Sequence, residues 1–313
     1  MKFRLFTALA IFTVVGVPLA QAQFGLGNVV KKVGIPSLSK ITSGPKPVST
    51  NIKDAVYGDP TKDGFVPPVA VQQLTGLERT DKGGFVLASG YYEMNAQTYC
   101  LKAGTHGPGK GNGYLYAPLK GSAKKAVKAI LQNSVAKPEI AQRDIQLLLW
   151  AIVARAKFED LNNRLKITAS QLLTKKQLAK LNRNALSVMN SRAFSKLIGG
   201  TPPLLRRALT AEADMRRIVT RPSIAYADAE RVAVLAGAAP MGDGSIETPS
   251  GRWNLHPDGY WVRFMPSGYS RTHVQIWVPQ GSDGVGEVYD PATQVAVPGN
   301  TSRQRIGQSG RQK

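Results

Sequence analysis

The sequence predicts an α+β protein in which a mainly helical region is followed by a small antiparallel β module. Apolar residues recur at helical spacing in the middle of the chain, as at Ile145, Leu148 and Ile152, which indicates helices packed on a common core. Toward the C-terminus the pattern changes to short runs of alternating polarity, such as 273–278, separated by turn residues. This second pattern is typical of half-buried strands joined in hairpins.

The first residues are typical of a secretory signal peptide. Two basic residues precede an apolar run over residues 5–17, and residues 20–22 have the small-x-small pattern of a cleavage site. The run is short and is ended by Pro18, so it does not suit a membrane span. We expect cleavage after Ala22, a periplasmic or secreted protein of the Gram-negative type, and no integral membrane span in the mature chain.

The remaining boundaries follow changes in composition. Residues 23–60 are rich in Gly, Ser, Pro and Lys and show no sustained period, which indicates a flexible leader. Residues 84–92 and 97–101 are rich in Val, Phe and Tyr and indicate two strands within the helical region. We expect five segments: a signal peptide (1–22), a flexible leader (23–60), a mainly helical region (61–240), an antiparallel β module (241–301) and a disordered basic tail (302–313).

The chain is strongly basic, with a formal net charge of +21, most of which remains after Lys2 and Arg4 leave with the signal peptide. Such a surface attracts anionic polysaccharide, lipopolysaccharide or nucleic acid. For an exported protein the envelope polymers are the favoured partners, and nucleic acid is the less favoured one. The basic residues are spread along the predicted helices without a dense block, which equally suits solvated helix faces.

Cys100 is the only cysteine, so no internal disulfide is available. In an oxidising compartment, a lone thiol is a liability unless it is buried, catalytic, shared with another chain or chemically capped. Tyrosines surround it in the sequence, at positions 91, 92, 99, 114 and 116. A Gly/Pro-rich loop that contains His106 follows over residues 104–113. The second notable feature is Gln146, which stands in a very apolar helical segment with Trp150 one turn further on, on the same face.

These motifs in this order resemble the thioester domains of bacterial surface adhesins, over about residues 91–158. That family has a Tyr-Cys motif and a helix with Thr/Ser-Gln-x-Ala-Ile/Leu/Val-Trp. The resemblance implies that Cys100 is the thioester cysteine, Gln146 the acyl donor and Trp150 a packing aromatic. It also implies that an amine on a surface ligand attacks the bond. This chain departs from the family pattern at Ile145, where the family has Thr or Ser, and at Leu148, where it has Ala.

The residues themselves are consistent with this chemistry. A thiolate held against a carboxamide can displace ammonia, because positioning replaces a bimolecular encounter. The activated acyl group then needs a dry pocket, for which the candidate lining residues are Tyr99, Tyr114, Tyr116 and Trp150. We expect His106 to take a proton from the incoming amine, since histidine titrates near neutral pH. The expected reaction is a single acyl transfer without turnover, and it requires no cofactor or metal.

Three other interpretations remain open. Cys100 can be a buried structural residue of a non-covalent envelope protein that binds anionic polymers. It can instead be the nucleophile of a cysteine hydrolase that uses His106 or His256. Aromatic and basic residues of the β module, Trp261 and Trp277 among them, can form a stacking surface for sugar or nucleic acid, although half of them must face the module's own core. The glycine-rich loop lacks the Gly-Lys-Ser/Thr ending of a phosphate loop.

Overall fold

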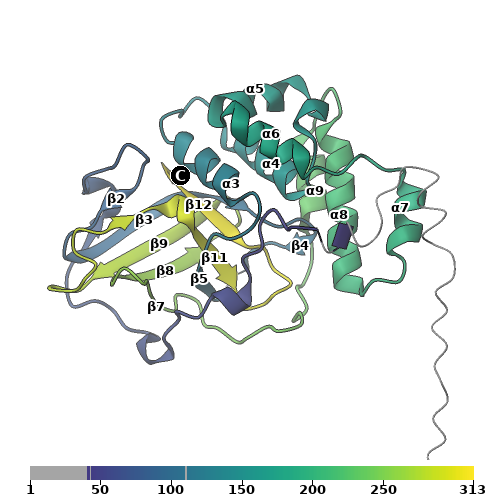
Figure 1. The fold of residues 1–313 in the computed structure, drawn as a ribbon. Helices are drawn as coiled ribbons and strands as arrows, with labels where there is room; N and C mark the ends of the chain where they lie inside the picture. The colour runs from purple at the N-terminus through teal and green to yellow at the C-terminus, as the bar shows by residue number, and fades with distance from the viewer. Residues whose placement is uncertain (1–40, 43, 110) are drawn as a thin grey trace, which may run out of the picture. The chain divides into compact units, whose positions relative to one another are not determined.

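The computed structural model describes residues 41–42, 44–109 and 111–313 (Figure 1). The expected signal peptide (1–22) and its cleavage point lie outside the described residues, as does the first part of the expected leader.

Within the described residues, six strands form a closed antiparallel β-barrel whose order differs from the chain order (Figure 1). Around the barrel the strands are β3 (Gly90–Cys100), β9 (Arg271–Val278), β8 (Trp261–Pro266), β5 (Tyr114–Pro118), β11 (Gln294–Pro298) and β12 (Ile306–Gln312). Because β12 pairs with both β11 and β3, the ring is closed.

Short strands flank the barrel. The strand β1 (Val71–Gln73) lies parallel to β3, and β7 (Asn254–Leu255) pairs antiparallel with β8. Two further pairs stand apart from it: β2 (Phe85–Val86) with β10 (Val288–Tyr289), and β4 (Thr105–His106) with β6 (Val234–Leu235).

The helices lie on one side of the barrel (Figure 1). In the described part of the chain they are α3 (Lys124–Asn133), α4 (Gln142–Val153), α5 (Asn163–Leu172), α6 (Lys175–Arg183), α7 (Ser191–Ile198), α8 (Pro203–Val219) and α9 (Tyr226–Ala233). Short 3-10 turns occur at Ile52–Asp54, Pro60–Lys62, Leu74–Gly76, Phe158–Asp160 and Pro291–Thr293. None of the helices described is both long and apolar enough to cross a bilayer.

Helix α4 is the centre of the helical layer. Every residue from 145 to 153 is buried, because the helix contacts α5, α8, α9 and β3 on different sides. The helix ends in a Schellman arrangement: the N–H of Ala156 donates to the carbonyl of Ala151, and that of Arg155 to Ile152. Arg155 holds the left-handed position of this motif, at φ 58°, where glycine is usual.

The expected division into a mainly helical region (61–240) and a separate β module (241–301) is wrong. The barrel takes β3 and β5 from the first segment and β8, β9 and β11 from the second, so the two segments share one core. The separate strands are visible as apolar runs in the sequence. Barrel closure, however, depends on pairing between distant residues, such as Gly90 with Val278, which local patterns do not specify.

The expected leader is folded where the structure describes it. In residues 44–60, the N–H of Ser49 donates to the carbonyl of Lys120 at 3.0 Å. The N–H of Asp59 donates to the carbonyl of Trp253 at 2.9 Å. These bonds tie the segment to the barrel, although its composition resembles that of a linker.

The expected disordered tail (302–313) contains the strand that closes the barrel. Residues 306–310 of this strand are buried although most of them are Gly, Ser or Gln, and the strand lies close to its neighbours: a Cβ at Gly307 would meet a methyl group of Leu101 at 2.8 Å. The carboxamide of Gln308 accepts a hydrogen bond of 2.9 Å from the Tyr289 hydroxyl. The polar composition of residues 302–313 therefore does not predict that they contain a strand of the barrel.

Replacing Ile306 by Ala tests the role of this strand. Ile306 is fully buried in the barrel interior, so we expect the free energy of unfolding to fall by about 2–5 kcal/mol in urea denaturation. The matched control is Val288→Ala, at a side chain that is 38% exposed, where we expect a change within about 0.5 kcal/mol. Equal, small effects of the two substitutions would contradict the assignment of β12.

Candidate functional site

The structure brings Cys100 and Gln146 together. Cys100 is the last residue of β3, and Gln146 lies in the first half of α4, which packs on that strand. The backbone N–H of Cys100 donates to Oε1 of Gln146 at 2.8 Å, and Nε2 of Gln146 donates to the Cys100 carbonyl at 3.2 Å. Both residues are at most 1% exposed. The carboxamide is therefore held against Cys100 in the core.

The reason for this pairing lies in the strand order. On an antiparallel strand, the N–H and C=O of one residue point to the same side. The N–H and C=O of Cys100 point away from β12, toward the side of β3 on which β9 lies. On that side β9 pairs with β3 only as far as Gln97, so it does not reach Cys100. Gln146 satisfies the groups that the shorter neighbour leaves unpaired. One helical turn earlier, Gln142 does the same for Thr98, donating to its carbonyl at 3.2 Å.

A cavity of about 160 Å³ opens beside Gln146. Its lining residues are Thr98, Gln142, Arg143, Gln146, Tyr226, Glu230, Tyr269, Ser270 and Lys313. The Tyr269 hydroxyl donates to the Glu230 carboxylate, and the hydroxyl groups of Tyr226 and Tyr269 are 3.1 Å apart. Trp150 packs behind them, with its ring centroid 5.6 Å from that of Tyr226. The site is thus a small, mainly polar cavity that brings together two tyrosines, the Glu230 carboxylate and two cationic side chains, Arg143 and Lys313.

The electrostatics of this region favour uncharged groups. Burial raises the pKa of the Cys100 thiol well above its ordinary value, and the nearby Glu230 carboxylate raises it further. Burial likewise raises the pKa of Tyr226 from 10.0 to about 12, and that of Tyr99 to about 12. The thiol therefore remains protonated near neutral pH, and its reaction requires a partner that accepts the proton.

The remaining site residues expected from the sequence are divided between different places. Tyr99 and Trp150 belong to the same core as Cys100. Tyr114 and Tyr116 belong to the barrel interior instead. Of these two, the Tyr114 phenol has its pKa raised by burial and, to a lesser degree, by Cys100, whereas the Tyr116 ring packs against Tyr57.

Neither histidine considered from the sequence lines the cavity beside Gln146. His106 is buried on β4 and lines a different pocket, together with Arg207 and Thr301. The ring of His256 stacks on that of Tyr260, with 4.4 Å between centroids. The cysteine-hydrolase interpretation gains no support from these positions.

Sequence reasoning missed Glu230, Tyr226 and Tyr269. A signal for the first two was present, because positions 226 and 230 lie one turn apart on a helix and therefore on one face. Tyr269 lies in the turn between β8 and β9, and only the tertiary fold brings it to the site. Among the described residues, no group of three or more His, Cys, Asp or Glu side chains could hold a metal ion.

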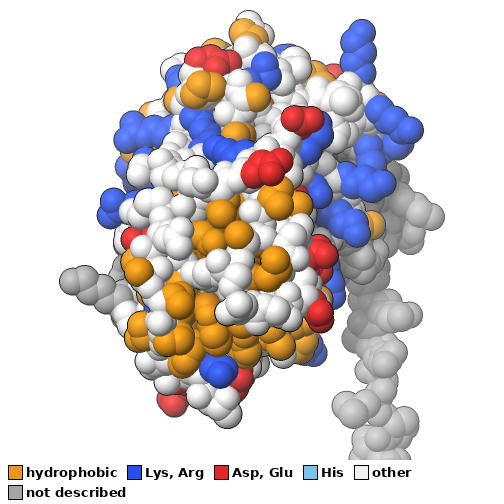
Figure 2. Space-filling model, turned by 90° about the vertical axis from the view of Figure 1, so that its left-hand side faces the viewer, with side chains coloured by type: hydrophobic (Ala, Val, Ile, Leu, Met, Phe, Trp, Pro, Cys, Tyr) orange, Lys and Arg blue, Asp and Glu red, His pale blue; other side chains and the backbone are white. Residues whose placement is uncertain are grey.

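The aromatic residues of the expected β module serve mainly as core. Trp253 is buried and donates its indole N–H to the carbonyl of Phe65 at 3.0 Å. Trp261 and Trp277 are partly exposed and stack on each other at 6.2 Å, with Lys62 over both rings. Figure 2 shows hydrophobic side chains on the lower part of one face, and Lys and Arg on its upper part.

Comparisons of this chain with protein-family models, with curated proteins and with solved structures give no match. The resemblance to thioester domains therefore remains a prediction from the sequence motifs.

Alkaline pH tests the uncharged character of this core. Because the folded pKa of Tyr99 is raised, the native state keeps a proton that the unfolded chain releases above pH 10. The contribution of Tyr99 to the free energy of unfolding is therefore fully present below pH 10. We expect it to be lost between pH 10 and 12, at about 1 kcal/mol per pH unit. Urea unfolding of the wild type and of Tyr99→Phe over this range measures the difference in slope. If the free energy of unfolding fell equally with pH in the wild type and in Tyr99→Phe, the raised pKa of Tyr99 would be contradicted.

Proposed function

We propose that this chain is a covalent binding protein, in which the sulfur of Cys100 and the side-chain carbonyl carbon of Gln146 form an internal thioester that reacts with amines. The observation that carries the proposal is the pair of hydrogen bonds between the Gln146 carboxamide and the backbone of Cys100, in a place shielded from water. The contact is informative because the two residues are 46 positions apart in the sequence, so that only the tertiary fold brings them together.

The reaction has two balanced steps. In the first, the thiol sulfur attacks the carboxamide carbon of Gln146; the C–N bond breaks, and ammonia leaves with the thiol proton. In the second, a primary amine attacks the same carbon; the C–S bond breaks, an amide forms, and the proton lost by the amine returns to the sulfur of Cys100. Positioning favours the first step, and the dry surroundings protect its product from hydrolysis.

Glu230 is the group best placed to carry the proton in both steps. The carboxylate lines the cavity beside Gln146 and acts on the titration of Cys100, as a nearby negative charge does. The Tyr269 hydroxyl holds it by a hydrogen bond. In this proposal Glu230 takes the role that the sequence analysis gave to His106.

The cavity suits the end of a lysine side chain. Its volume of about 160 Å³ admits a slender alkylamine more readily than a bulky amine. Glu230 is the one carboxylate in the lining. Arg143, whose guanidinium lies over the Tyr226 ring, and Lys313 line the cavity as well, and their positive charges favour the neutral form of the incoming amine, which is the form that reacts. We therefore propose a lysine-bearing protein on a surface as the ligand of an exported, single-use binder.

A second candidate function is non-covalent binding of an anionic envelope polymer. The observation that favours it is the gathering of Lys and Arg side chains on the upper part of the face in Figure 2. Polyanion binding of this kind is released by salt, whereas an amide bond is not. Washing the captured ligand with 1 M salt, on the order of the concentration that screens surface charges, separates the two functions.

The intact mass of the purified mature protein is the first test. A thioester makes the chain lighter by one ammonia than its plain sequence, and methylamine then adds its own mass and frees one thiol. The thiol is to be assayed with iodoacetamide after denaturation, because Cys100 is buried in the native state whether or not the bond exists. Cys100→Ser and Gln146→Ala are the matched controls, and both should show the plain mass. A wild-type mass equal to that of the plain sequence would refute the proposal.

Replacing Glu230 by Gln tests the proton acceptor. The substitution keeps the shape and removes the base, so we expect the rate of methylamine incorporation to fall about 100-fold or more. The control is Glu287→Gln, at an exposed position away from the cavity, which should leave the rate unchanged. Because neutral amine carries the reaction, the wild-type rate should also rise with pH. Equal rates for the two variants would exclude Glu230 from the chemistry.

A further inference from the structure

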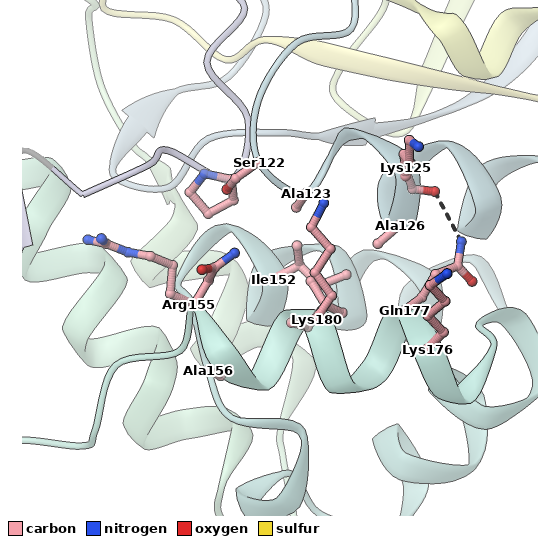
Figure 3. A pocket seen from close by; sticks show the side chains of 13 residues that line it. Ser122, Ala123, Lys125, Ala126, Ile152, Arg155, Ala156, Lys176, Gln177 and Lys180 are labelled. Carbon is pink, nitrogen blue, oxygen red and sulfur yellow. Dashed lines mark hydrogen bonds between the residues drawn. The ribbon is translucent and has the colours of Figure 1, made fainter.

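A second cavity, larger than the first, lies between α3, the end of α4 and α6 (Figure 3). Its volume is about 340 Å³, within the range usual for small-molecule sites. The residues that line it are Pro47, Ser122, Ala123, Lys125, Ala126, Ile152, Arg155, Ala156, Lys176, Gln177, Lys180, Leu181 and Asn184. No member of this set contributes to the cavity beside Gln146.

The floor of the cavity is apolar. Ile152 and Leu181 supply branched side chains, and the neighbouring positions on α3 and after α4 are alanines. Alanine side chains leave space that larger side chains would fill between packed helices. The result is a hydrophobic hollow that water solvates poorly, which favours an apolar occupant.

The rim of the cavity is cationic. Lys125 belongs to α3, and Lys176 and Lys180 lie one turn apart on α6. In the described part of the chain, none of these three amino groups makes a hydrogen bond or ion pair. No Asp or Glu lines the cavity. In Figure 3 the Lys180 side chain rises from α6 toward Ala123, across the hollow.

The two walls of the cavity are fixed to each other. Nε2 of Gln177 on α6 donates to the backbone carbonyl of Lys125 on α3 at 3.3 Å (Figure 3). On the other side, the guanidinium of Arg155 donates to the carbonyl of Ile41 at 2.8 Å and lies 3.6 Å from Glu212. The hollow is therefore built before any ligand arrives, which lowers the entropic cost of binding.

We infer that this cavity binds a small amphipathic carboxylate, a molecule with one apolar chain or ring and one anionic head. The apolar body occupies the alanine-lined floor, and the head lies among Lys125, Lys176 and Lys180. The absence of lining carboxylates excludes a cation as the ligand, and the limited volume excludes a folded polymer segment. The inference is independent of the proposed thioester, because the two cavities share no residue.

Calorimetric titration of the full chain with decanoate, decanol and acetate tests this inference. Decanol has the apolar body without the charge, and acetate has the charge without the body. We expect decanoate to bind one site at least about tenfold more tightly than either, since both parts of the cavity contribute. Equal binding of decanoate and decanol would overturn the inference, as would binding to anionic vesicles without binding to monomeric decanoate.

Two matched double variants locate the site. Lys125→Gln/Lys176→Gln removes two charges from the rim, whereas Lys124→Gln/Lys175→Gln removes the same number from adjacent exposed positions outside the cavity. We expect the first pair to weaken decanoate binding several-fold and the second to leave it unchanged. A third variant, Ala156→Phe, should block the hollow, with its melting curve showing that the fold is kept. Loss of binding in both lysine pairs alike would assign the effect to net charge and overturn the site.

Discussion

The site depends on one constraint: β3 extends further than the strand beside it. The strand pairing of β3 with β9 ends at Gln97; the Thr98 N–H still donates to the carbonyl of Ser270, but the Thr98 carbonyl and the backbone groups of Cys100 have no strand partner on this side. Buried backbone groups without partners cost about 1–3 kcal/mol each. Helix α4 supplies these partners with two glutamines, Gln142 and Gln146, one turn apart. The helical layer is thus positioned on the barrel by side chains that imitate a strand, and this places a carboxamide at the only cysteine.

The same geometry serves structure and chemistry together. A glutamine that only completes a strand needs a donor and an acceptor in the right direction, and Gln146 has both. The site also contains a group that strand pairing does not require. The Glu230 carboxylate accepts a hydrogen bond from Tyr269 and lines the same cavity as Gln146. A structural glutamine has no need of a proton acceptor beside it. This combination is why the covalent function is the one that the site supports best.

The sequence predicts individual segments of this site, but it does not predict the long-range strand pairing that closes the barrel and assembles them. Helical periodicity around Ile145 predicts the α4 segment, and the apolar run before Cys100 predicts a strand, because both signals are local. The barrel follows from pairings between distant segments, so it was missed. Glu230 was missed for the same reason: its place on one face of α9 beside Tyr226 is a local signal, but only the tertiary fold brings that face to the cavity beside Gln146. The polar residues of β12 were misread because their hydrogen bonds to other buried groups, and not their hydrophobicity, place them inside.

The strand β12 is synthesised long after β3, the strand with which it pairs, and this delay affects when the barrel can close. Ser309 of this strand bonds to Gln97 of β3, 212 positions earlier in the chain. At about 5–20 residues per second, the ribosome needs roughly 10–40 s to cover that interval. Until then the edge of β3 that pairs with β12, opposite β9, lacks its neighbour, and the core around Cys100 is incomplete. Any bond that caps the sulfur of Cys100 inside the folded protein must therefore be a late maturation event, made after translation has passed β12.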